Sequence, residues 1–294
     1  MFDCLVAGDA NVDLLMNGVI ALQPGTEKLA QGMNLVLGGS SAITAFNLCR
    51  LGRKVAFAGV VGQDLLGRFV EEKLASGGVD IRWLARSDTE KTGLTIWHSC
   101  HGERAGVTYQ GTIAMLDADD ILDDMLKSAR HFHVGAYFVQ SRLHAGAAKL
   151  FARAKALGLT TSIDCNYDPA ERWDSNLLEV LEYADLFFPN EDEARAITGS
   201  PTAAGAAREL ATRAGCVVVK MGARGALIAT RSREFEVAAI PDEVVDTTGA
   251  GDSFNAGFLS RFVLGEDLDA CAEAGVLAAA RNVGQVGGTT AFES

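Results

Sequence analysis

The stretch that decides the fold is DTTGAGDSFNAGFL, which runs from Asp246 to Leu259. Phe254 and Phe258 recur in it at helical spacing, which predicts an apolar helix that begins near residue 250. Three residues with little or no side chain stand at its start: Gly249, Ala250 and Gly251. Their backbone N–H groups can approach a ligand closely, and the positive end of the helix dipole would face the same turn. The stretch therefore predicts a pocket for an anion.

Asp252 lies inside the first turn of this predicted helix. A carboxylate in that place is consistent with two roles. The helix dipole can stabilise it there, or it can take a proton from a group that attacks the anion. For a lone Gly-Asp pair the structural role would be the better interpretation, so the rest of the chain has to decide.

The composition favours a globular protein that acts on a small molecule. The chain has 294 residues, 48% of them hydrophobic, so it can bury a sizeable core. Its net charge of −12 opposes contact with nucleic acid or acidic membranes, and we expect neither as a partner. A nucleotide can still bind at a local site built from backbone N–H groups, a Lys and a metal ion.

The cysteines indicate a reducing compartment. All six are scattered and no CxxC pair occurs, which is typical of reduced thiols. The first residues form an apolar strand without a basic or cleavage-site pattern, so no secretory signal is predicted. Residues 29–49 contain no charge, but polar side chains interrupt them too often for a transmembrane helix. We therefore expect a cytoplasmic protein.

Predicted strands and helices alternate from residue 4 to the end of the chain. The alternation has no Pro-rich or Ser-rich linker, which predicts an α/β fold with a central, mostly parallel sheet and helices on both faces. Ligands would bind at the carboxyl ends of the strands. After the first strand, Asp9, Asn11 and Asp13 alternate on one face. A carboxylate and an amide suit a polyol, although Asp9 is equally consistent with a solvated edge strand.

Residues 246–259 resemble, in almost every position, the C-terminal signature of the ribokinase-like (PfkB) carbohydrate kinase family. The same family has a double glycine ahead of a helix, as at residues 38–39, and an N-x-x-E motif, as at residues 190–193. The resemblance implies a single ribokinase-like kinase domain over residues 1–294. It also implies a small β-sheet lid, formed by about residues 14–36 and 92–112. The implied reaction moves the γ-phosphate of ATP to a hydroxyl of a sugar or sugar-like polyol.

The resemblance also assigns roles to individual residues. Asp252 would be the general base, and the N–H groups of Gly249, Ala250 and Gly251 would form the anion hole. The residues implied to bind substrate are Asn11, Asp13, Gly38, Gly39 and Ser40. Those implied to bind ATP or ADP are Asn190, Lys220, Gly222 and Gly225. Glu193 would hold Mg²⁺ through water, and Asp246 and Thr248 are candidates for a monovalent cation such as K⁺.

Two positions depart from the family pattern. Ile43 stands where the family usually has an Asn that touches substrate. Asp168 stands where the family often has an Arg. Ribose therefore cannot be assumed as the substrate, and an anionic sugar acid is disfavoured.

Several alternatives remain beside a sugar kinase. Trp97 and Tyr109 of the expected lid suit an aromatic stack, so a nucleoside kinase of the same family is the closest. A non-catalytic sugar-binding relative is less favoured, because Asp252 is intact. A homodimer formed through the lid is a further expectation. The motif GAGDSF half resembles a dinucleotide fingerprint, but its third glycine is Phe254, and a Walker motif is excluded because no Gly-Lys pair occurs.

Histidines raise a metal hypothesis that the spacing does not favour. His131 and His133 would lie on one face of a strand, and His98, Cys100 and His101 are the other candidates. Their spacing matches no tetrahedral zinc pattern. We therefore interpret them as polar residues near a substrate cleft.

Overall fold

The computed structural model describes residues 1–18, 24–100, 103–241 and 244–293. A nine-stranded sheet runs through its centre, in the order β13-β12-β11-β10-β9-β8-β1-β4-β5. The strand bounds are β1 (Phe2–Ala7), β4 (Val55–Gly62), β5 (Asp80–Ser87), β8 (Ala129–Val134), β9 (Thr160–Ile163), β10 (Leu186–Phe187), β11 (Cys216–Lys220), β12 (Ala226–Ala229) and β13 (Glu234–Val237).

The central sheet is mostly parallel, as the alternation of strands and helices predicts. Every neighbouring pair from β11 to β5 is parallel, and only β12 and β13 join in antiparallel register. Central strands are apolar on both sides, as in Val217–Val219, which is fully buried. That pattern is typical of a parallel sheet covered on two faces. All the parallel strands end at one edge, and this edge carries the site described below.

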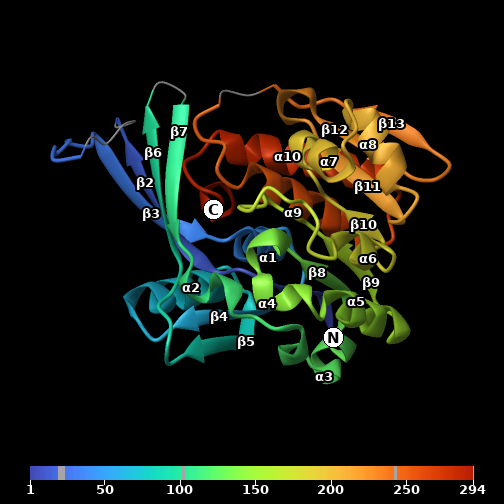
Figure 1. Cartoon of the computed structure of the whole chain (residues 1–294), viewed down its shortest axis with the longest axis horizontal. Helices are drawn as coiled ribbons and strands as arrows, with labels where there is room; N and C mark the ends of the chain where they lie inside the picture. The colour runs from blue at the N-terminus through green and yellow to red at the C-terminus, as the bar shows by residue number, and fades with distance from the viewer. Residues whose placement is uncertain (19–23, 101–102, 242–243, 294) are drawn as a thin grey trace.

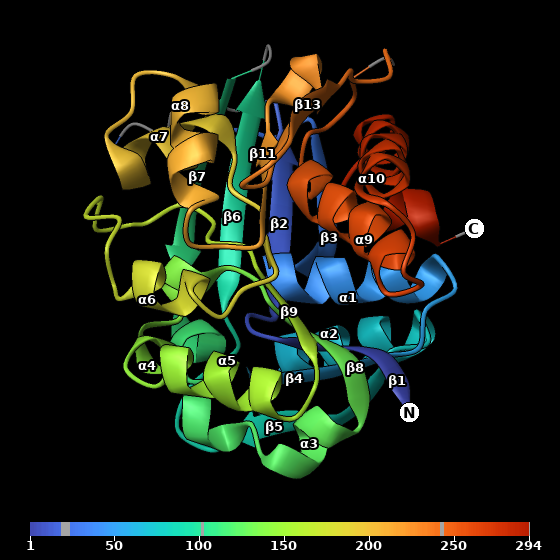
Figure 2. The same ribbon diagram turned by 90° about the vertical axis from the view of Figure 1, so that its right-hand side faces the viewer.

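Helices cover both faces of the sheet (Figure 2). One layer packs into the core beside β1 and β4 and consists of α1 (Ser40–Arg50), α2 (Leu65–Ser76), α9 (Ala250–Phe262) and α10 (Leu268–Val283). The other layer consists of α3 (Asp123–Lys127), α4 (Ser141–His144), α5 (Ala147–Ala156), α6 (Leu177–Leu181), α7 (Glu191–Thr198) and α8 (Ala203–Leu210). The helix expected from residue 250 is therefore present as α9, between α1 and α10.

A second sheet of four strands stands at one end of the central sheet (Figure 1). Its order is β3-β2-β6-β7, and the bounds are β2 (Asn11–Asn17), β3 (Gly32–Gly38), β6 (Leu94–Cys100) and β7 (Glu103–Tyr109). We call this sheet the lid. The first part of the lid, β2 and β3, runs from residue 11 to residue 38. It therefore begins three residues earlier and ends two residues later than the expected range 14–36. Residues 19–23 and 101–102 of the expected lid lie outside the described residues.

The lid separates two kinds of side chain by strand alternation. On one face, Asp13 of β2 pairs with Thr95 of β6, which pairs with Thr108 of β7. On the other face lie apolar residues paired across the four strands: Leu35, Leu14, Ile96 and Val107. The polar face points to the site, because Asp13, Thr95 and Thr108 line the cavity described next.

No helix in the described ranges combines the length and the apolar character needed to cross a bilayer.

Candidate active site

The lid and the carboxyl ends of the central strands enclose a cavity of about 780 Å³. It brings together segments that are far apart in the sequence, from the lid, α1, β9, β11 and α9. The predicted site residues that line it are Asn11, Asp13, Gly39, Ser40, Asn190, Glu193, Lys220, Gly222, Thr248, Gly249, Gly251 and Asp252. Four others do not line it: Gly38, Gly225, Asp246 and Ala250.

The turn before α9 fits the cavity because it is made of glycine. Gly249 is the N-cap of α9 with φ of 72°, a left-handed conformation that favours glycine. A Cβ on Gly249 would also lie 2.5 Å from the Cα of Gly288. Gly251 faces the cavity next to a cation, since a Cβ there would lie 3.4 Å from Lys220 Nζ. The N–H of Ala250, which was expected in the anion hole, donates instead to the Thr247 carbonyl at 3.2 Å.

Asp252 projects from the first turn of α9 and is half-buried. The Ser40 hydroxyl donates to Asp252 Oδ1 at 2.5 Å, which joins the start of α9 to the start of α1. The pKa of Asp252 is raised to about 8, first by burial and then by the negative charge of Asp164. The hydrogen bond from Ser40 and the charge of Lys220 oppose this rise. A carboxyl with such a pKa can exchange a proton near neutral pH.

Asp9 is a structural residue rather than part of a solvated edge strand. Its side chain is 5% exposed and accepts hydrogen bonds from the N–H groups of Ser40, at 3.0 Å, and Ser41, at 2.8 Å. These are orphan donors of the first turn of α1, which has no side-chain cap of its own. Asp9 therefore fixes the start of α1 and with it the hydroxyl of Ser40.

The lid contributes a buried amide and carboxylate to the cavity. Asn11 Nδ2 donates to Asp13 Oδ1 at 3.1 Å, and the two side chains are 3% and 6% exposed. Gly38 lies opposite Asn11 in the lid, and a Cβ on it would collide with the Asp13 carboxylate. Gly38 thus serves the site by leaving room for Asp13, rather than by direct contact. Ile43 of α1 also lines the cavity and packs against Gly288.

Lys220 is held at the far side of the cavity by groups from two other elements. Its Nζ donates to Asp164 Oδ2 at 2.6 Å and to Asn255 Oδ1 at 3.5 Å. Burial pushes the pKa of Asp164 up, but the charge of Lys220 and the hydrogen bonds from Lys220, Asn255 and the Asn166 N–H together outweigh burial, so the pKa is lowered. Asn255 also donates to Asp164 at 2.5 Å. Sequence reasoning missed Asn255, although a polar residue three positions after Asp252 on an apolar helix lies on the same helix face.

The N-x-x-E motif forms a capping box at the start of α7. Glu193 N–H donates to Asn190 Oδ1, and Asn190 N–H donates to Glu193 Oε2, both at 2.8 Å. Burial and the nearby Asp164 charge raise the pKa of Glu193. The ligand atoms of Asp164, Cys165 and Glu193 lie within 4.8 Å of one another. The carboxylates of Asp164 and Glu193 line the cavity, and such oxygen ligands suit Mg²⁺.

Two of the predicted ligand residues stabilise loops. Gly225 has a φ of 95°, and a Cβ on it would collide with the Val237 carbonyl, so its place is a tight turn before β12. Asp246 Oδ1 accepts from the N–H and hydroxyl of Thr248, at 2.9 and 2.6 Å, and Oδ2 accepts from Gly287 N–H at 2.9 Å. These bonds hold the loop before α9 against the loop at Gly287. A monovalent cation at Asp246 and Thr248 stays a prediction.

Asp168, at the family's Arg position, also has a structural role. It accepts hydrogen bonds from the N–H groups of Ala170, Arg172 and Trp173 at 2.8 to 2.9 Å. Burial pushes its pKa up, but these N–H groups outweigh burial and the pKa is lowered. Its carboxylate is therefore used within its own loop, and its neighbours Tyr167 and Pro169 line the cavity instead.

The aromatic and histidine candidates divide between cavity and core. Trp97 lines the cavity and packs over Gly106 of β7. Tyr109 does not, because it is 50% exposed and its hydroxyl donates to Glu90. His131 and His133 do share one face of β8, as expected; both are fully buried, contact the Ser162 hydroxyl at 2.7 Å and do not line the cavity. His101 lies outside the described residues.

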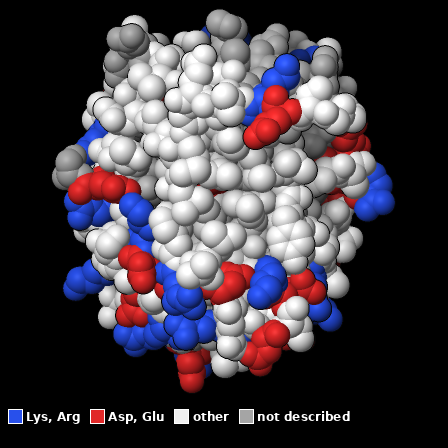
Figure 3. All heavy atoms as spheres, turned by 90° about the vertical axis from the view of Figure 1, so that its left-hand side faces the viewer, with Lys and Arg blue, Asp and Glu red and all other residues white. Residues whose placement is uncertain are grey.

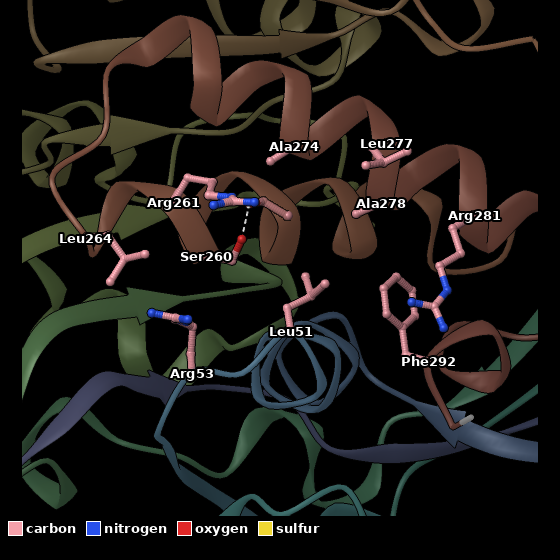
Figure 4. A pocket seen from close by; sticks show the side chains of 11 residues that line it. Leu51, Arg53, Ser260, Arg261, Leu264, Ala274, Leu277, Ala278, Arg281 and Phe292 are labelled. Carbon is pink, nitrogen blue, oxygen red and sulfur yellow. Dashed lines mark hydrogen bonds between the residues drawn. The ribbon is translucent and has the colours of Figure 1, made fainter.

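A second hollow of about 350 Å³ lies on the other side of α9 (Figure 4). It lies between the end of α1, α9 and α10, and its apolar lining includes Leu51, Leu277 and Phe292. Arg53, Arg261 and Arg281 stand around it, and its described lining includes no carboxylate. It therefore lacks a group that could act as a base, unlike the cavity at the start of α9.

The fold and the cavity together define a class of protein. A cavity at the carboxyl ends of parallel strands that combines a helix N-terminus with buried carboxylates can bind an anion and the hydroxyl groups of a small molecule side by side. The family model of the pfkB carbohydrate kinases matches residues 1–294, and the chain belongs to this family. The protein is therefore a carbohydrate kinase of ribokinase-like fold.

Individual relatives differ in the acceptor that their names give. A nucleoside kinase from Methanothermobacter thermautotrophicus is 29% identical over 92% of this chain and 85% of its own. A 2-dehydro-3-deoxygluconokinase from Bacillus subtilis is 30% identical over 76% of this chain and 73% of its own. The crystal structure of a putative ribokinase II from E. coli, in complex with ATP and Mg²⁺, superposes with a TM-score of 0.87 at 25% identity, covering 99% of this chain and 96% of that one.

Proposed function

We propose that this protein transfers the γ-phosphoryl group of ATP to a hydroxyl of a sugar or sugar-like polyol. The observation that carries the proposal is the position of Asp252. It lies at the N-terminus of α9, bonded to Ser40 beside the lid residues, and the charge of Lys220 acts on it from the same wall. A group at this place can touch an acceptor under the lid and a phosphate at the helix end at once.

Each step of the transfer can be given to residues of this chain. Asn11 and Asp13 bind acceptor hydroxyls, and Asp252 takes the proton of the hydroxyl that attacks the γ-phosphorus. The bond from phosphorus to the ADP oxygen breaks as the new bond forms. The N–H groups of the turn at Gly249 and Gly251, with the dipole of α9, stabilise the charge on the phosphoryl oxygens. Lys220, which lies beside this turn, and Asn190 bind the nucleotide phosphates.

Glu193 and Asp164 would hold Mg²⁺, through water, where their carboxylates line the cavity. The ion would supply positive charge to the phosphates. The residues of the chain keep the positioning roles, and the lid excludes water so that ATP is not hydrolysed. We place the enzyme in the cytoplasm, where ATP is available; the five cysteines whose side chains are described are free thiols, which supports this placement.

A nucleoside is the second candidate acceptor. Trp97 favours it, because its ring lines the cavity and offers a face for a base. Tyr109 gives it no support, since it lies on the other side of β7. A non-catalytic sugar-binding relative is the weakest candidate, because Asp252 retains the base position.

The outer face of the lid supports a homodimer. Figure 3 shows this side of the molecule, with most Lys, Arg, Asp and Glu in its lower half and few over its upper half. Exposed apolar residues on it include Met33, Leu35 and Val107, at 64, 40 and 62%. A patch of this kind marks a protein contact. A Leu35→Glu, Val107→Glu double variant should change a dimer to a monomer in light scattering; a wild-type monomer at high concentration would remove this assignment.

The test of the kinase function is acceptor-dependent release of ADP. Purified protein with ATP and Mg²⁺ is assayed against sugars, polyols and nucleosides, and the phosphorylated product is identified by mass spectrometry. We expect ADP and phosphorylated acceptor in equal amounts. ATP that stays intact with every acceptor would refute phosphoryl transfer.

A further inference from the structure

We infer that the acceptor is an uncharged polyol, and that sugar acids and sugar phosphates are excluded by the charge of the cavity. This inference rests on the proposed phosphoryl transfer and narrows its substrate class. The shared chemistry is a neutral ring or chain with neighbouring hydroxyls, as in a free sugar or a nucleoside.

The first argument is the charge of the cavity wall. Among the described residues, five carboxyl groups line the cavity: Asp9, Asp13, Asp164, Glu193 and Asp252. Burial raises the pKa of Asp9, Glu193 and Asp252, so the negative charge that faces the acceptor is that of Asp13. Lys220 is the only Lys or Arg among these lining residues. Its ammonium donates to Asp164 at 2.6 Å, and its side chain is only 14% exposed, so it is committed to the nucleotide side.

The second argument is distance. Lys220 ends β11, whereas Asn11 and Asp13 follow β1, and these two strands are four places apart in the sheet. At about 4.8 Å for each strand, the backbones of these two strands are roughly 19 Å apart within the sheet. The long Lys220 side chain extends toward β9 and the start of α9, where it meets Asp164 and Asn255. Its charge reaches Asp252, where the two ends of the cavity meet, but beside Asn11 and Asp13 the described lining has no Lys or Arg.

The third argument is what the acceptor end offers instead. Asp13, Thr95 and Thr108 form one row across the lid, and the two threonine hydroxyls lie 3.1 Å apart. A carboxylate and hydroxyls bind neutral hydroxyl groups well, because the carboxylate accepts from them. A second anion about 4 Å from the Asp13 carboxylate would be repelled, by an amount that corresponds to about 10³-fold in binding.

Two further residues exclude the contacts that an anion would need. Ile43 replaces a polar side chain with an apolar one where the lid meets α9. The Asp168 carboxylate accepts hydrogen bonds from the N–H groups of its own loop, so this position offers the acceptor no cationic side chain. Anionic acceptors are normally bound by Arg or Lys in a bidentate or charged contact, and this end of the cavity provides none in the described chain.

The test compares specificity constants within one panel. Ribose, fructose and adenosine serve as uncharged acceptors, and 2-dehydro-3-deoxygluconate and fructose 6-phosphate serve as anions. We expect kcat/KM for the best uncharged acceptor to exceed that for the best anion by at least about 100-fold. Within the uncharged set, Trp97→Leu distinguishes a nucleoside acceptor from a free sugar. It should lower kcat/KM for adenosine about tenfold and leave kcat/KM for ribose and fructose nearly unchanged.

Two variants test the cause of the preference. Thr108→Lys adds a cation to the cavity face of the lid and should raise the anion-to-neutral ratio of kcat/KM by at least about tenfold. Asp13→Asn removes the negative charge at constant shape and should raise the same ratio, although total activity falls. Leu122→Lys is the control for Thr108→Lys. Leu122 is 56% exposed and lies before α3, so a Lys there should leave the anion-to-neutral ratio unchanged. A melting curve for each variant verifies folding.

The outcomes separate this inference from the proposed function. An anion used within about tenfold of the best neutral acceptor would overturn the inference and leave the kinase function in place. An anion-to-neutral ratio unmoved by Thr108→Lys would overturn the electrostatic cause. ATP that stays intact with every acceptor would overturn the phosphoryl transfer itself, and the inference with it.

Discussion

The two walls of the cavity are built in different ways. The wall at α9 consists of backbone and of side chains held by hydrogen bonds: Gly249 in a left-handed conformation, Asp252 in the first helical turn, and Lys220 held by Asp164 and Asn255. The lid wall consists of alternate side chains from strands that meet only in the folded protein. The first wall fixes the chemistry, and the second decides which acceptor reaches it. A substitution in one wall should therefore have little effect on the kinetic constants that depend on the other wall.

Removing the base gives the largest expected effect, and it affects every acceptor equally. Asp252→Asn keeps the shape and the Ser40 contact but cannot take a proton, so kcat should fall by about 10²-fold or more with ATP binding nearly intact. Steady-state kinetics and calorimetric titration of ATP measure the two quantities. Asp124→Asn, whose carboxylate is 97% exposed, is the matched control. Near-normal turnover of Asp252→Asn would remove Asp252 from the mechanism.

Removing the cation of the α9 wall should affect ATP more than the acceptor. Lys220→Met loses a charged contact, worth about 2 kcal/mol or about 30-fold in kcat/KM for ATP. Because the Lys220 charge holds down the pKa of Asp252, the variant should also need a higher pH for its activity. A purely structural role would not move that pH profile. The double variant Lys220→Met, Asp164→Asn removes the buried unpaired charge, and should recover thermal stability but not activity.

Removing an amide of the lid wall should affect the acceptor alone. Asn11→Ala deletes one neutral hydrogen-bonding group, so KM for the acceptor should rise about tenfold while KM for ATP changes less than about twofold. Asn17→Ala makes the same change on β2 at a residue that does not line the cavity. Equal rises in both KM values for Asn11→Ala would mean that the two walls are not separate.

The smallest expected effect is a pH dependence set by burial of Asp252. Its pKa is raised to about 8, and the base must be deprotonated, so activity should be lost as pH falls through 8. With both substrates far below saturation, the rate should rise about threefold between pH 7.5 and 8.5. Residual activity of Asp252→Asn should lack this rise. If the variant followed the same curve, another group would be responsible.

Much of the α9 wall could be predicted from sequence because its elements are local. A run of small residues before an apolar period defines a turn and a helix start, and the resemblance of residues 246–259 to the family then indicated a base at Asp252. The capping box of Asn190 and Glu193 is likewise contained in four neighbouring residues. Asn255 was missed because only its contact with Asp164, 91 residues away, distinguishes it from any polar residue on α9.

Sequence alone determined the parallel sheet, the helix that begins near residue 250 and the family, since periodicity and short motifs act over a few residues. Only the tertiary structure decided which side chains meet. It placed Asp9 on α1 rather than in solvent and Tyr109 outside the cavity, and it gave Gly225 and Asp246 contacts within their loops. The reason is physical: strand register and helix packing bring together residues hundreds of positions apart, and no local pattern encodes which of them will touch.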